Sequence, residues 1–189
     1  MNIEELEKNW NTYDSLCRRL SDSNLNNMLD DIGERLVMCP ASTKEDQYGC
    51  YPGGLIEHGL KVTDAMRRIN TALDLKVPTA AIIKVGLLHE IGKVGDENND
   101  YYQEQTSDWH REKLGQLYTY NENLEKMTVS HRTLWLLQHY GVRLDRDEWE
   151  AISTAQGFHL EENKFYAYTK NNLTKMLLSA KTLVTTQSQ

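Results

Sequence analysis

The chain has 189 residues, of which 39% are hydrophobic and 26% are charged, and its formal net charge is −7. That length suits one domain with a proper hydrophobic core, and the composition argues against disorder and against a fibrous design. The negative balance argues against broad binding of duplex nucleic acid, which depends on neutralising many phosphates. It still permits a small phosphorylated ligand, for which one local cluster of cations is enough. No apolar run reaches the roughly 18–20 residues that span a bilayer, so no membrane partner is expected.

The cysteines and the N-terminus bear on the compartment. Cys17, Cys39 and Cys50 are odd in number and lack the spacing of a metal finger, so we expect reduced thiols in a cytoplasmic setting. Residues 1–9 are acidic and polar, which is not the composition of a signal peptide.

Helical periodicity of the apolar residues runs along most of the chain. The predicted helices, in chain order, cover residues 3–20, 24–38, 55–73, 79–89, 109–117, 130–140, 144–152 and 173–184. Between them, residues 39–54 hold two prolines and three glycines and are predicted to form a loop, as is the polar and acidic stretch 96–108. No segment alternates convincingly with period two. The sequence therefore predicts a single all-α domain over 1–189, with N-terminal helices in 1–38, a loop in 39–54 and the core in 55–189.

Two segments carry histidines next to glycines and a carboxylate. Residues 51–62 read YPGGLIEHGLKV and present His58 early in a helix, while residues 86–96 read GLLHEIGKVGD and end a helix at His89 and Glu90. Divalent ions prefer neutral imidazoles and carboxylates that converge from different helices. Taken alone, a single histidine beside a glycine loop is more often a helix cap or a core partner.

Together, the two segments make a more specific pattern, with His58 and His89 separated by 31 residues (89 − 58). The pattern resembles the HD superfamily of metal-dependent phosphohydrolases, whose members carry GGL-x-EH followed by LLHD-x-GK. Further stretches are similar to a subgroup often met in bacteriophage genomes, namely SDWHREKLG at 107–115, YN at 120–121, DEWEAI at 147–152 and EN at 162–163. The resemblance covers most of residues 30–185.

The resemblance implies an HD-like helical bundle that holds one or two divalent ions, such as Mn, Mg, Fe, Co or Ni, and hydrolyses a nucleotide or another small phosphoester. It implies metal ligands at His58, His89 and Glu90, and a phosphate contact at Lys93. Asp96 would hold or activate the attacking water, although a solvated loop acid is an equally good interpretation. The subgroup implies the cytoplasm of a bacterial host.

Further cations are candidates for substrate contacts. Arg111, His131 and Arg132 could each supply a substrate contact on grounds of exposure, and Lys181 is a fourth candidate. Oligomeric state does not follow from the sequence, and a homo-oligomer remains open.

Three departures from the family pattern bear on the metal site. The usual His-Asp pair is His89-Glu90 here, which shifts the carboxylate by about one bond length. The sequence AQG stands at 155–157, where a His-Asp-Gly type of sequence is common. Residues 177–181 read LLSAK, which puts Lys181 where the family closes its site with an aspartate. No Asp or Glu follows Glu162, so a shift of register does not restore this ligand.

The lysine leaves three alternatives open. Lys181 pairs with Glu90 and repels a metal, or it points outward, or it contacts a substrate phosphate beside a metal on the remaining ligands. At an effective dielectric constant of about 20, a unit charge at about 4 Å contributes about 4 kcal/mol, enough to abolish tight binding of a divalent ion. Two hypotheses therefore stand: a phosphohydrolase with a reduced metal site, and an inactive HD scaffold that binds a nucleotide or a protein partner.

Overall fold

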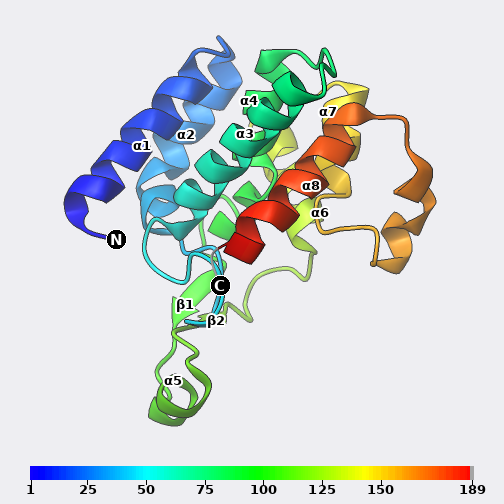
Figure 1. The fold of residues 1–189 in the computed structure, drawn as a ribbon. Coiled ribbons are helices and arrows are strands. Elements are labelled where there is room, and N and C mark those ends of the chain that lie inside the picture. The colour runs from blue at the N-terminus through cyan, green and yellow to red at the C-terminus, as the bar shows by residue number, and fades with distance from the viewer. Residues whose placement is uncertain (188–189) are drawn as a thin grey trace.

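The structure, a computed structural model, describes residues 1–187, and its chain is mostly helical (Figure 1). The prediction of an all-α fold is confirmed. The helices are α1 (Ile3–Arg18), α2 (Ser23–Met38), α3 (Gly54–Ala72), α4 (Thr79–Leu88), α5 (Asp108–Leu114), α6 (Val129–His139), α7 (Arg146–Ser153) and α8 (Asn172–Gln187). Two 3-10 helices, η1 (Ile91–Val94) and η2 (Glu161–Tyr168), and two short strands, β1 (Tyr102–Glu104) and β2 (Tyr118–Tyr120), complete the described elements.

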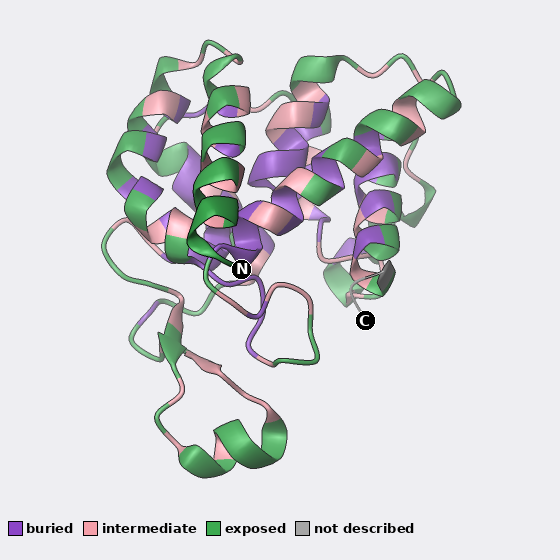
Figure 2. Ribbon diagram, turned by 60° about the vertical axis from the view of Figure 1, so that its left-hand side comes forward, coloured by how far each residue is buried: buried purple, intermediate pink, exposed green. Residues whose placement is uncertain are grey.

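One hydrophobic core joins α1–α4 and α6–α8, and its buried members run from Tyr13 in α1 to Val184 in α8. Helix α3 lies at its centre, where it packs most extensively against α4 and α8. Figure 2 shows that the buried residues gather on the sides of the helices that face one another. Residues far apart in the sequence, on α3, α4 and α8, are thereby brought to one place.

The pair Gly53 and Gly54 stands at the start of α3. Gly53 has φ +83°, a left-handed conformation that favours glycine, and a Cβ on Gly54 would lie 2.0 Å from the carbonyl oxygen of Gly49. The loop 39–54 therefore packs tightly against the start of α3. This contact sets the position of His58 in the second turn of the helix.

A further glycine, Gly92 in η1, lets η1 approach α6 closely. Helix α4 ends at Leu88, and η1 follows after His89 and Glu90. A Cβ on Gly92 would lie 2.6 Å from the backbone nitrogen of Thr133, so only glycine fits this approach. The turn between α4 and η1 consequently faces the inside of the bundle rather than the solvent.

An arm projects from the helical body (Figures 1 and 2). Strands β1 and β2 pair antiparallel, with Tyr102 opposite Tyr120, and α5 lies between them in the sequence. The prediction of an unbroken loop over 96–108 missed β1, and the predicted helix 109–117 is too long. Helix α5 ends at Leu114 because Gly115 takes a left-handed φ of +57°, after which the chain turns into β2.

None of the helices in residues 1–187 is long and apolar enough to cross a membrane. The three cysteines are free, and all are buried.

Candidate functional site

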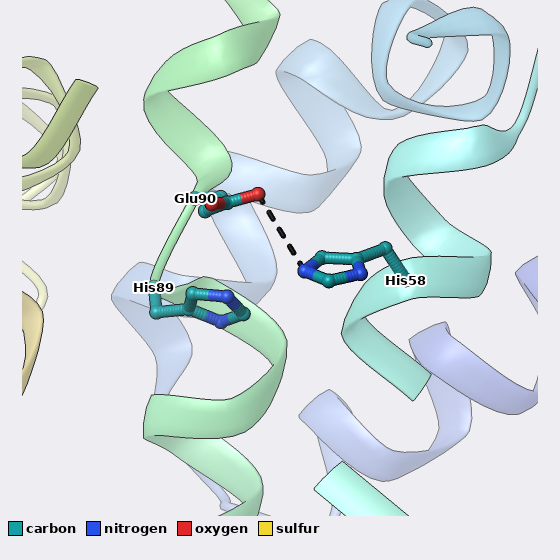
Figure 3. A group of neighbouring side chains, drawn as sticks. All are labelled: His58, His89 and Glu90. Atoms are coloured by element: carbon teal, nitrogen blue, oxygen red, sulfur yellow. Dashed lines mark ion pairs between the residues drawn. The ribbon is translucent and has the colours of Figure 1, made fainter. Parts of the chain in front are cut away.

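His58, His89 and Glu90 meet inside the bundle (Figure 3). His58 comes from α3, whereas His89 and Glu90 come from the turn after α4. Their ligand atoms all lie within 4.8 Å of one another, and all three side chains are buried. Two imidazoles and a carboxylate at this separation form a group that can hold a metal ion.

Both imidazoles are neutral at physiological pH. Burial lowers the pKa of His58 to about 4 and that of His89 to about 3, and the neighbouring carboxylate of Glu90 opposes this effect in each case. The distance of 3.8 Å between His58 Nε2 and Glu90 Oε2 is therefore no ion pair at neutral pH.

The Nε2 atoms of His58 and His89 are buried without a hydrogen-bond partner. His89 Nδ1 lies 2.9 Å from the carbonyl oxygen of Gly86, so Nδ1 carries the proton and donates it there. The lone pair of His89 Nε2 is consequently left free in the cluster that His58, His89 and Glu90 form. A hydrogen bond from the other ring nitrogen to a backbone carbonyl is the arrangement that orients metal-binding histidines.

Two lysines hold the carboxylate of Glu90. Lys181 Nζ, from α8, lies 2.7 Å from Oε1, and Lys93 Nζ lies 2.7 Å from Oε2. The Lys181 ammonium also donates to the carbonyl oxygen of Ala155 at 2.6 Å. Each oxygen of Glu90 is thus already paired with a positive charge, and no side chain of this group is more than 14% exposed.

The electrostatics of the three charged groups are coupled. Although burial acts to raise the pKa of Glu90, Lys181 and then Lys93 lower it well below its usual range. Burial acts to lower the pKa of Lys93, but Glu90 raises it above the usual value. For Lys181 burial is the stronger effect and lowers the pKa, against the attraction of Glu90. With Glu90 ionised and both lysines protonated, the cluster carries a net charge of +1 (2 − 1) beside two neutral imidazoles.

The metal that the family resemblance implies fits this cluster only in part. The two free Nε2 atoms suit an ion, because neutral imidazole is a good ligand. The ammonium of Lys181 does not, because it occupies Glu90 Oε1 and repels any cation placed near it. Of the three alternatives for Lys181, the structure shows the pairing with Glu90.

Tyr48 belongs to the cluster and was missed from the sequence. Its ring centroid lies 4.4 Å from that of His58, and its hydroxyl accepts a hydrogen bond from Lys93 Nζ at 3.0 Å. Lys93 also donates to the carbonyl oxygen of Ala41 at 2.7 Å. The loop 39–54, which supplies both groups, has no periodic pattern that assigns an orientation to its side chains.

Two predicted site residues lie apart from the cluster. Asp96 accepts hydrogen bonds from the backbone nitrogens of Asn98 and Asn99, which lower its pKa although partial burial opposes this. It therefore orders its own turn, and it is not among the residues that form the metal-binding group. Arg111 is exposed on α5, in the projecting arm.

His131 and Arg132 lie in the first turn of α6 and line a groove of about 870 Å³. His131 is exposed, whereas Arg132 is only 3% exposed. The sequence placed these two residues and Lys181 in one set of substrate contacts. The structure instead places Lys181 in the buried cluster and the other two beside the groove.

The chain matches no protein-family model, no curated protein and no solved structure. Its function must therefore be inferred from the cluster and its surroundings.

Proposed function

We propose that this protein is an HD-type domain in which the ammonium of Lys181 replaces the metal ion, and that it binds a small phosphorylated ligand, such as a nucleotide, without hydrolysing it. The observation that carries the proposal is the 2.7 Å ion pair between Lys181 Nζ and Glu90 Oε1. The motifs around His58 and His89, together with the mostly helical fold, support the family assignment.

The reason is electrostatic. A divalent ion gains little from Glu90 while both carboxylate oxygens are paired with ammonium groups. To enter, it must displace Lys181 from Glu90 and from the Ala155 carbonyl oxygen. Separating one partner from a buried ion pair typically costs about 3–5 kcal/mol. The tethered lysine is therefore a strong competitor for the position.

A second candidate is the metal-dependent phosphohydrolase itself. The observation that favours it is the pair of buried Nε2 atoms of His58 and His89, which have no partner in the protein. Buried polar atoms are normally satisfied, and an unsatisfied pair of imidazole lone pairs suits a metal ion. This candidate requires Lys181 to leave Glu90.

The cellular setting that we propose is a bacterial cytoplasm. It is supported by the three free, buried thiols, since disulfides are rare in reducing compartments.

Metal content measured by mass spectrometry, after purification and soaking in manganese, tests the proposal. We expect wild type and His89→Ala to carry equally little metal, far below one ion per chain. Roughly one manganese per wild-type chain that disappears in His89→Ala would contradict the proposal and favour the phosphohydrolase.

A further inference from the structure

The groove at the start of α6 contains a buried cation with no anion beside it. Arg132 is 3% exposed, and its guanidinium makes one hydrogen bond, from Nη2 to the carbonyl oxygen of Glu125 at 2.9 Å. Its Nε is buried without a partner. Among the described residues, no carboxylate lies within ion-pair distance of Arg132.

Three lysines with largely covered side chains, which are 8%, 14% and 18% exposed, behave differently. Lys93 and Lys181 pair with Glu90, and Lys84 pairs with Glu148. A buried charge without a counterion is unfavourable, so evolution tends to retain one only where something compensates for it. An oxyanion from a ligand supplies that compensation, because the planar guanidinium presents several N–H groups to the two oxygens of one phosphate or carboxylate.

Aromatic rings stand next to this cation. The Cζ atom of Arg132 lies 5.1 Å from the ring centroid of Tyr101, whose ring lies 5.1 Å from that of Tyr120. Tyr120 is 52% exposed and lines the groove. An exposed tyrosine in the same groove as a buried guanidinium offers a stacking surface for a planar ring whose anionic group lies on the guanidinium.

The rest of the groove is compatible with a bound anion. It includes the N-terminal turn of α6, an 11-residue helix whose dipole favours negative charge at this end. His131 and Lys126 line it as well. The carboxylates of Glu122 and Glu125 also line it, but these residues are exposed, so water screens their charges far more than that of Arg132. Its volume, about 870 Å³, lies within the range of sites for small molecules.

We propose that this groove binds a compound in which a planar aromatic ring carries an oxyanion, with the oxyanion on Arg132 and the ring on Tyr120. A nucleoside monophosphate has this chemistry. The inference rests on the proposed function for its class of ligand, and it places that ligand at the start of α6 rather than at the buried cluster of Glu90 and its lysines.

Isothermal titration of the full chain in a buffer that contains a chelator tests the site, with AMP, adenosine and adenosine-5′-carboxylate as probes. We expect AMP to bind wild type at least tenfold more tightly than adenosine does, because hydrogen bonds to a charged group contribute roughly a 10- to 100-fold gain. Tighter binding of the carboxylate than of AMP would identify a carboxylate as the oxyanion, whereas the reverse order would identify a phosphate.

Variants locate the binding. Arg132→Lys should weaken AMP roughly tenfold or more, because an ammonium lacks the planar fork of the guanidinium. Tyr120→Ala alters an exposed residue that should not disturb folding, and it should weaken AMP roughly fivefold or more through lost stacking. Arg67→Ala, exposed on α3 and outside the groove, is the matched control and should leave the affinity unchanged.

Three outcomes would overturn the groove: equal affinity for AMP and adenosine, no binding of AMP up to millimolar concentration, or unchanged AMP affinity in both Tyr120→Ala and Arg132→Lys. If Lys181→Met alone weakens AMP, the ligand lies at the buried cluster. In that case the groove is wrong while the proposed binding function stands. The proposed function itself fails on manganese content, which is measured separately.

Discussion

Two ion pairs, one on α4 and one just after it, look alike in composition and differ in what surrounds them. Lys84 pairs with Glu148 of α7 at 3.0 Å, with side chains 18% and 7% exposed. Just beyond the C-terminal end of α4, Glu90 pairs with Lys181 of α8 at 2.7 Å, with side chains 6% and 14% exposed. Both pairs connect α4 or its C-terminal turn to a later helix.

Around the first pair, the polar groups are satisfied by the protein. Glu148 also accepts the backbone N–H of Asp145 in the capping box of α7, and Lys84 donates to the carbonyl oxygen of Arg143. These are the contacts of a structural ion pair.

Around the second pair, the protein leaves the Nε2 atoms of His58 and His89 unsatisfied and gathers a further lysine on the same carboxylate. Stability alone does not account for such an arrangement, because unsatisfied buried polar atoms are destabilising. The comparison supports the proposal that Lys181 takes the place of a metal ion in a group that has suitable donors.

Neutralising each glutamate in turn should give the largest difference in stability between the two ion pairs. Glu90→Gln leaves the ammonium groups of Lys93 and Lys181 buried near each other without an anion, and we expect it to lower the free energy of unfolding by about 3–5 kcal/mol. Glu148→Gln keeps an acceptor for the α7 cap and leaves one partly exposed lysine, so about 1 kcal/mol is expected. Urea denaturation measures both, and equal losses would show that the cluster is no more than an ordinary structural pair.

Acid should destabilise the cluster through its histidines, with a smaller effect. The pKa of His58 is 6.5 before folding and about 4 in the folded protein, so the unfolded chain binds a proton that the folded chain rejects. The stability from this group is fully present above pH 6.5 and is lost as the pH falls toward 4, by about 3 kcal/mol in total.

Thermal unfolding of wild type and His58→Gln across this pH range measures the effect. We expect a shallower loss of melting temperature in the variant, since glutamine does not titrate. Parallel curves would mean that folding leaves the pKa of His58 unchanged, against its burial beside Lys93 and Lys181.

The sequence predicts the helical body well because amphipathic periodicity is a local signal, and the apolar residues of that pattern are the ones that the core buries. It predicts the arm poorly. Strands β1 and β2 have three residues each, and Tyr102 pairs with Tyr120, 18 positions later. No short stretch of sequence therefore contains both partners of this strand pair. Gly115 ends α5 through its left-handed backbone conformation. In the sequence, a glycine at the end of a short helical stretch was the signal for this helix end.

The donor residues of the candidate site could be predicted from the sequence, but the partner of Lys181 could not. His58, His89 and Glu90 were expected to converge, and the structure brings them together as a group that can hold a metal. Whether Lys181 turns toward Glu90, outward or toward a ligand depends on the register of α8 against α3 and α4, which is a tertiary property. Arg132 was a candidate for a substrate contact on grounds of exposure, but it is 3% exposed and lies against the ring of Tyr101.

The most direct test of the central claim is to titrate manganese into wild type and Lys181→Asp by calorimetry, with Lys181→Met as the neutral control. The change to aspartate removes one positive charge and adds one negative charge beside the free Nε2 atoms of His58 and His89. The account predicts no binding to wild type up to millimolar manganese, weak binding to Lys181→Met, and about one ion per chain at micromolar affinity for Lys181→Asp. Wild type that binds one manganese as tightly as Lys181→Asp does would contradict it, because Lys181 would then not compete for the site.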